Sequence, residues 1–373
     1  MGHLLAVAQH FISQGVVLDV KEYGSGNVND TFLVTVGRAA PTGKPKLAGE
    51  RFILQRLNTG VFRQPELVMA NLAAVTGHVR QRLKLQPPSP GRRFEVPQVL
   101  LSRDGQDHVL DAAGAFWRAL SFIDRAVTFD IIKDQDHGRE VGQALGLFHC
   151  LLTDLSPSRL ADTLPGFHVT PGYLRHYDEI RAVRDAPPSA EVEYCLGFVD
   201  ERRDLAYVLE SAREQGKLRP RVVHGDPKVN NVMLDIETGE AVALVDLDTV
   251  KPGLVHYDIG DCLRSGCNPL GEETEAWDRV RFEPDIARAI LKGYLLWARD
   301  FLSDQDYAYL YDGIRTLAFE LGLRFFTDYL AGDVYFKARY PEHNLARALV
   351  QFKLTQSIEV QARDIRGIIL DLA

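Results

Sequence analysis

The sequence predicts an α+β protein of two lobes, with a small antiparallel sheet in the N-terminal lobe and mainly helices in the larger C-terminal lobe. The chain has 373 residues, which is more than one average domain. Apolar and polar positions alternate in its first part, as in strands, whereas helical spacing dominates from Gly138 onward. We therefore expect an N-terminal lobe over residues 1–120 and a C-terminal lobe over residues 121–373.

The composition excludes several classes of protein. Hydrophobic residues at 46% and charged residues at 25% are ordinary for a globular chain and argue against a disordered or fibrous one. A net charge of -8 disfavours binding to nucleic acid, which needs a basic surface. No secretory signal or stretch of 18 apolar residues is present, so we expect a cytoplasmic protein without a membrane partner, as a monomer or homodimer.

The predicted strands of the N-terminal lobe follow one another around loops. The segment LDVKEYGSGNVNDTFLVTV indicates strand, loop and strand, and RFILQRL adds another strand. Residues 64–85 have helical spacing, and EVPQVLLSRDGQDHVLDAAGAFWRALSFI indicates two more strands around the Asp104-Gly105 turn. The expected result is a small sheet that carries one helix.

The C-terminal lobe begins with three long helical segments, VGQALGLFHCLL, YLRHYDEIRAVRD and DERRDLAYVLESAREQGK. Two short β-like runs, NVMLDI and AVALVDL, are separated by ETGE, which is typical of a hairpin turn. Helices then continue from about Pro284 to the end of the chain.

The loop YGSGNVNDTF is a candidate phosphate-binding segment. It contains Gly24, Ser25, Gly26 and Asn27 and leads into a strand, whereas a dinucleotide-binding fingerprint leads into a helix. Small residues between two strands can fold over a triphosphate and offer backbone N–H groups. The alternative is a hairpin turn without a ligand.

The segment HGDPKVNN has the spacing of the kinase catalytic loop H-R-D-x-x-x-x-N. By this spacing we expect the carboxylate of Asp226 to lie near the attacking hydroxyl as a base, and the amide oxygen of Asn231 to be a ligand for Mg²⁺. Lys228 supplies a compact positive charge for the transferred phosphate. A structural turn capped by Asp226 is the alternative.

The segment AVALVDLDTV strengthens this interpretation. Its apolar strand ends in Asp246, where the kinase template has a second carboxylate ligand for Mg²⁺ after a hairpin. Asp248 either contacts metal or substrate or is a solvated strand end. Two independent signals in the same order favour phosphoryl transfer more than either alone.

The template also expects a lysine on the third strand, and FILQRLN has only Gln55 and Arg56 there. We expect Arg56 to carry the charge and Glu66 in the following helix to be its acidic partner. Strand alternation places Gln55 and Arg56 on opposite faces, so the sequence leaves open which of them faces the site. A protein substrate is disfavoured because no A-P-E or activation-loop pattern is present.

These motifs make a family resemblance visible. HGDPKVNN followed by LVDLDT resembles the aminoglycoside phosphotransferase and choline kinase superfamily, which has a protein-kinase-like fold and phosphorylates small-molecule hydroxyls. Together with YGSGNVNDTFLV, FILQRLN, WRALSFI, VDLDTVKPGLVHYDIGDCLR and RFFTDYLAGDVYFK, they resemble the N-acetylhexosamine 1-kinases. The resemblance covers about residues 23–361.

The resemblance implies that ATP and Mg²⁺ are used to phosphorylate the anomeric hydroxyl of N-acetylglucosamine or N-acetylgalactosamine. It implies Asp226 as the base and Asn231 and Asp246 as the metal ligands. Adenine is expected at the backbone of the linker between the lobes. That linker consists of Ser121, Phe122 and Ile123.

The resemblance also implies that Tyr257, Asp258 and Asp261 support the metal-binding loop. An uncharged sugar must be bound by hydrogen bonds and ring stacking, so LRFFTDYLAGDVYF is the candidate acceptor segment. The residues that we expect to bind substrate are Asp30, Asp248, Arg324, Asp333 and Tyr335, and Asp328 is a further polar position in this segment.

For the acceptor segment, an amphipathic helix with a solvated face is the alternative. Two other functions also remain open from sequence: a kinase for another sugar, an aminoglycoside or a choline-like molecule, and a non-catalytic binding protein.

Overall fold

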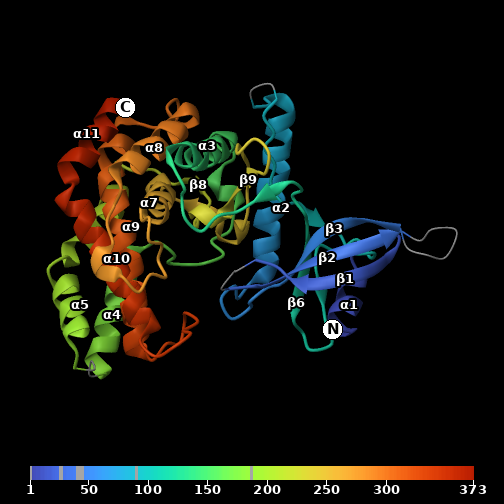
Figure 1. Ribbon diagram of the computed structural model, residues 1–373, viewed down its shortest axis with the longest axis horizontal. Coiled ribbons are helices and arrows are strands. Elements are labelled where there is room, and N and C mark those ends of the chain that lie inside the picture. Colours follow the sequence, from blue (N-terminus) through green and yellow to red (C-terminus); the bar gives the residue numbers. More distant parts are fainter. Residues whose placement is uncertain (1, 25–27, 39–45, 89–90, 185–187) are drawn as a thin grey trace.

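The computed structural model describes residues 2–24, 28–38, 46–88, 91–184 and 188–373. Figure 1 shows the sheet-bearing N-terminal lobe at one end of the long axis and the helices of the C-terminal lobe at the other. The α+β prediction is confirmed. Within these ranges, no helix is long and apolar enough to cross a membrane.

The N-terminal sheet is antiparallel, with the strands in the order β1-β2-β3-β6-β4 and with β5 also paired to β6. Two helices accompany it, one more than predicted, because the opening segment forms α1 against the outer face of the sheet. The strands around Asp104-Gly105 span two residues each, and both pair with β6. The elements are α1 (Gly2–Gln9), β1 (Val16–Glu22), β2 (Asp30–Arg38), β3 (Lys46–Arg56), α2 (Pro65–Leu85), β4 (Val99–Leu100), β5 (Val109–Leu110) and β6 (Phe116–Ser121).

Strand alternation divides β3 and β6 between two cores. Phe52 and Leu54 of β3 and Trp117 of β6 belong to the outer core beneath α1. Phe116 and Leu120 of β6 belong to the large core shared with the C-terminal lobe. Side chains of alternate residues therefore point towards the C-terminal lobe, and this alternation decides which polar residues of β3 and β6 reach the site.

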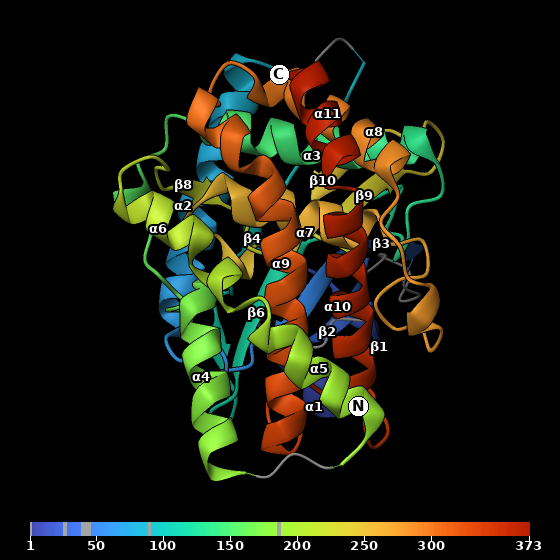
Figure 2. The same ribbon diagram turned by 90° about the vertical axis from the view of Figure 1, so that its left-hand side faces the viewer.

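The C-terminal lobe contains two small sheets, with β10-β9-β7 in one and β11-β8 in the other. Figure 2 shows α4, α9 and α10 running along one another, with α5 crossing them. The elements are β7 (Ala126–Val127), α3 (Gln135–Leu151), α4 (Thr170–Val183), α5 (Ala190–Asp200), α6 (Val208–Glu214), β8 (Arg221–Val223), β9 (Val232–Asp235), β10 (Ala241–Leu244), β11 (Lys251–Gly253), α7 (Val255–Gly266), α8 (Pro284–Ala298), α9 (Asp304–Ala331), α10 (His343–Val360) and α11 (Ala362–Leu372).

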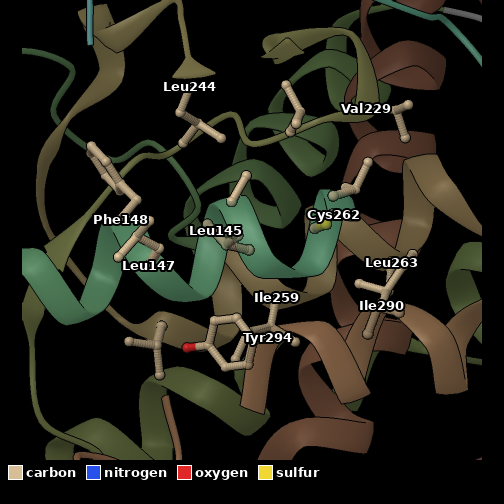
Figure 3. Packing of buried hydrophobic residues seen from close by; sticks show 14 of the residues in the cluster. Leu145, Leu147, Phe148, Val229, Leu244, Ile259, Cys262, Leu263, Ile290 and Tyr294 are labelled. Atoms are coloured by element: carbon tan, nitrogen blue, oxygen red, sulfur yellow. The ribbon is translucent and has the colours of Figure 1, made fainter. Parts of the chain in front are cut away.

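Helices α3 and α8 contact each other through glycines. A Cβ atom at Gly142 would lie 1.9 Å from the carbonyl oxygen of Ile290, and one at Gly293 would lie 2.0 Å from that of Arg139. Only glycine permits this backbone approach. The close approach fixes α3 beneath the strands that carry the site, and Figure 3 shows Leu145 and Phe148 of α3 in the same core as Val229 and Leu244.

Candidate active site

Asp226, Lys228 and Asn231 lie together in the loop after the buried strand β8. The Asn231 Nδ2 donates to the main-chain oxygen of Asp226 at 2.7 Å and lies 3.3 Å from its carboxylate Oδ2. The Lys228 Nζ lies 3.0 Å from the same Oδ2. This carboxylate raises the pKa of Lys228, so the lysine stays charged.

Asp246 follows β10 and is joined to this loop through the neighbouring strand. The N–H of Val245 donates to the carbonyl of Asn231 at 2.9 Å, which places the predicted metal ligands on adjacent strand ends. Asp246 has the left-handed backbone angle φ 62°, a costly conformation for a residue with a side chain. Such strain is typical of functional positions.

The donor chemistry of Asn231 and Asp246 fits Mg²⁺, which prefers a few protein oxygens together with phosphate and water. In the described part of the chain, the side-chain oxygen of Asn231 has no protein donor. Although Asp246 reaches solvent, desolvation and then the carboxylates of Asp248 and Asp226 raise its pKa to about 7. A bound cation would relieve this crowding of negative charge.

Asp258 of α7 supports the catalytic loop from beneath, as predicted. It accepts the N–H groups of His224 at 2.6 Å and Gly225 at 2.8 Å, and His149 of α3 lies 2.8 Å from it. Burial alone would raise the pKa of this carboxyl, but the His149 hydrogen bond and the charges nearby lower it. The neighbouring Tyr257 hydroxyl donates to Glu210, and Asp261 pairs with Arg264 at 2.8 Å.

His168 holds the same loop from the other side and was missed by sequence reasoning. Its ring nitrogens lie 2.6 Å from the carbonyl oxygen of Gly225 and 2.8 Å from Glu320 of α9. Burial alone would lower the pKa of His168, but the Glu320 carboxylate raises it. A protonated ring donates to both oxygens, so His168 couples α9 to the residue before Asp226.

The linker between the lobes offers free backbone groups where adenine is expected. Ser121 ends β6 and donates its N–H to Gln98 at 2.8 Å. In the described ranges, the N–H groups of Phe122 and Ile123 make no protein hydrogen bond. The Phe122 ring lies 5.9 Å from that of Tyr23, beside the glycine loop.

Gly24 of the glycine loop has φ 78°. The predicted phosphate-binding residues Ser25, Gly26 and Asn27 lie outside the described residues.

The structure corrects the assignment of charge on β3. Arg56 lies on the outer face, where its guanidinium pairs with Asp30 on β2 and both side chains are exposed. Gln55 faces inward instead. The prediction that Arg56 faces the nucleotide site is therefore wrong. The predicted contact of Asp30 with substrate does not fit either, because the Asp30 carboxylate pairs with Arg56. Glu66 is exposed on α2, so it is not the acidic partner of a site cation.

The structure also corrects the predicted role of Asp248. Arg118 of β6 donates to its Oδ1 at 2.5 Å and Asn29 donates to its Oδ2 at 2.7 Å. The side chain of Asp248 is 3% exposed. With both oxygens bound by residues of the N-terminal lobe, Asp248 is a buried link between the lobes and neither a substrate ligand nor a solvated strand end.

Arg324 and Tyr335, both predicted to bind substrate, lie close together. The Arg324 Cζ lies 4.9 to 5.9 Å from the ring centres of Phe167, Tyr173, Tyr335 and Phe336. In the described ranges its guanidinium makes no hydrogen bond or ion pair with the protein. Although burial alone would lower the pKa of Arg324, nearby groups raise it, with Tyr173, Tyr335 and Glu320 contributing more than the Asp226 carboxylate, so Arg324 stays charged.

Asp333 is explained by the turn that follows α9. The helix ends at Gly332, and Asp333 has φ 58° and accepts a hydrogen bond from Asn344 at 2.8 Å. The buried Asp328 accepts the N–H groups of Val334, Tyr335 and Phe336 at 2.8 to 3.0 Å. The two aspartates therefore shape the turn that presents Tyr335, and the predicted contact of Asp333 with substrate does not fit its engagement with Asn344.

Residues 19–302 match the phosphotransferase enzyme family. The chain belongs to this family. The match includes Asp226, Asn231 and Asp246, whereas the turn with Tyr335 lies beyond it.

Solved structures are similar to this phosphotransferase over nearly its whole length. A microcompartment-associated aminopropanol kinase has 15% identity and a TM-score of 0.61, with 99% of each chain covered. Choline kinase from Cryptosporidium parvum Iowa II has 14% identity and a TM-score of 0.57, covering 94% of this chain and 91% of its own. An aminoglycoside phosphotransferase solved with GDP and kanamycin has 11% identity and a TM-score of 0.55, covering 98% and 99%. At these identities the likeness shows the fold.

Proposed function

We propose that this phosphotransferase uses ATP and Mg²⁺ to phosphorylate the anomeric hydroxyl of N-acetylglucosamine or N-acetylgalactosamine. The sugar oxygen forms a bond to the γ-phosphorus while the bond to the β,γ-bridging oxygen breaks. The products are the sugar 1-phosphate, ADP and the proton of the hydroxyl. The metal supplies charge neutralisation at the phosphates when it is bound.

The roles of the loop residues follow from their positions. Asp226 orients the acceptor hydroxyl and accepts its proton. Lys228, charged and 3.0 Å from the Asp226 carboxylate, stabilises negative charge on the transferred group. Asn231 and Asp246 would hold the metal, and the backbone of Phe122 and Ile123 would receive adenine.

One observation carries the choice of acceptor. Arg324 places an unpaired guanidinium within electrostatic reach of Asp226, in a ring of four aromatic side chains. Its donors suit the oxygens of an uncharged, hydroxyl-rich acceptor, and the aromatic rings suit the apolar face of a sugar. The same charge repels ammonium groups, which argues against choline-like molecules and aminoglycosides.

The experiment is ³¹P NMR of the purified protein with Mg-ATP and one acceptor at a time: N-acetylglucosamine, N-acetylgalactosamine, kanamycin or choline. We expect a new anomeric phosphate signal with an N-acetylhexosamine and none with its 1-O-methyl glycoside, in which the acceptor oxygen is blocked. Transfer to kanamycin or choline alone would overturn the acceptor. ATP binding without transfer to any acceptor would favour a non-catalytic binding protein.

A further inference from the structure

The N-terminal lobe contains a buried cation that the sequence did not single out. Arg118 of β6 is 1% exposed and lies directly opposite Gln55 in the β3–β6 register. Its Nε and Nη2 donate to the Gln55 Oε1 at 3.0 and 2.7 Å. The inward position on β3 thus holds an amide that orients an arginine from the neighbouring strand.

Arg118 joins the lobes at the metal-binding strand end. Its Nη2 also donates to Asp248, which lies two residues after Asp246, and Asn29 at the end of the glycine loop holds the other oxygen of Asp248. The Arg118–Asp248 pair therefore lies two residues along the backbone from a proposed metal ligand.

Helix α2 does not supply the partner for this cation. Its buried polar residues are Asn71, which donates to the carbonyl of Val250 at 3.0 Å, just beyond Asp248, and Thr76, which donates to the carbonyl of Leu72. In the kinase template a β3 lysine pairs with a helix glutamate and serves the phosphates. Here the cation is on β6 and its carboxylate partner comes from the C-terminal lobe.

One donor of this guanidinium is unused. In the described ranges, the Arg118 Nη1 is buried without a hydrogen-bond partner, and a buried donor of this kind is costly. An ion pair that is broken on one side leaves an uncompensated buried charge, so the geometry of the whole link is strongly constrained. These are the properties of a residue that holds other groups in place.

We propose that Arg118 is the cation of the nucleotide site in this chain, in place of a β3 lysine. It is a positioning residue: through Asp248 it fixes the backbone that presents Asp246. The proposal rests on the nucleotide half of the proposed function and is independent of the identity of the acceptor.

The test is calorimetric binding of ADP with Mg²⁺ and with EDTA, without any acceptor. We expect Arg118→Met to reduce Mg-ADP affinity roughly tenfold or more, and to reduce ADP affinity in EDTA much less. Arg56→Met, a matched change on the outer face, should leave both within about twofold, as surface pairs contribute little. Arg118→Lys should recover part of the loss.

A double variant guards against misfolding. Arg118→Met/Asp248→Asn removes both buried charges, and we expect it to fold and to bind Mg-ADP no worse than Arg118→Met alone, because the two residues act as one unit. Additive losses, equal losses with and without Mg²⁺, or unchanged Mg-ADP affinity in Arg118→Met would each overturn the proposal. If the unaltered protein bound no nucleotide, the proposed function itself would fail.

Discussion

The loop around Asp226 and the turn after α9 that presents Tyr335, which we call the acceptor turn, are built in different ways. The loop around Asp226 is held from two sides by buried groups, Asp258 with His149 below it and His168 with Glu320 beside it. The acceptor turn is held by hydrogen bonds to Asp328 and Asp333 at its base, and Tyr335 is 53% exposed. The loop that we propose for the chemistry is thus supported by buried groups, whereas the surface that we propose to select the acceptor lies at the end of a helix.

The largest expected effect comes from the loop. Asp226→Ala should reduce kcat by about 10³-fold because the acceptor loses its base, while ADP affinity stays nearly unchanged. Stopped-flow or steady-state turnover with calorimetry separates the two quantities. Retained turnover would show that Asp226 is not the base. The loop around Asp226 would then no longer differ from the acceptor turn as the site of the chemistry.

The second-largest expected effect is a loss of stability when Asp258, the buried carboxylate beneath the loop of Asp226, is changed. Asp258→Asn replaces an acceptor of several hydrogen bonds by an amide whose NH₂ faces donors, so the free energy of unfolding should fall by about 2–4 kcal/mol. Urea unfolding measures this change. Asp178→Asn, in an exposed pair with Arg203, is the control and should change it by less than about 1 kcal/mol. An equal fall in the free energy of unfolding in both variants would show that Asp258 supports the fold no more than an exposed ion pair does.

On the acceptor side, Arg324→Met should raise the acceptor KM roughly tenfold or more, since a charged donor to the sugar is lost, with ATP affinity unchanged. Initial rates at varied sugar and fixed ATP give this value. Arg315→Met on the same helix is the control, because Arg315 pairs with Asp312. A wild-type KM in Arg324→Met would contradict the assignment of Arg324 to acceptor binding.

The smallest effect is a pH dependence. The folded-state pKa of His168 is raised above 6.5, so its contribution to stability is fully present below that value and is lost as the pH rises through the folded pKa. The free energy of unfolding should therefore fall on the alkaline side, and His168→Gln should flatten that fall. Urea titrations across pH check this, and an unaltered slope in the variant would contradict it.

The loop residues could be predicted because their spacing is local. Asp226, Asn231 and Asp246 lie around one hairpin, and strand ends bring them together without help from distant parts of the chain. The same reasoning placed the main strands and α2. In residues 95–123, where two strands were predicted, three form, β4, β5 and β6, because pairing with β6, and not local pattern, defines the short strands β4 and β5.

The site residues that were missed or wrongly assigned depend on contacts between distant parts of the chain. Which face of β3 looks inward is decided by tertiary packing, so Arg56 was chosen over Gln55 and Arg118 went unnoticed. His168 carries no local motif and acts across 57 positions of sequence on Gly225. Asp248 was predicted as a ligand because its partner Arg118 lies 130 positions away in the chain. Asp333 was predicted as a ligand because its partner Asn344 lies 11 positions on, in the next helix, and no local motif links the two.

The most direct measurement is the ratio of kcat/KM for N-acetylglucosamine to that for glucosamine, at a pH where the glucosamine amine is protonated. The two acceptors share the anomeric hydroxyl and differ in charge. We predict a ratio above about 10² in the unaltered protein and a smaller ratio in Arg324→Met, because the repelling charge is gone. A ratio near one, or one that Arg324→Met leaves unchanged, would contradict selection of an uncharged acceptor by Arg324.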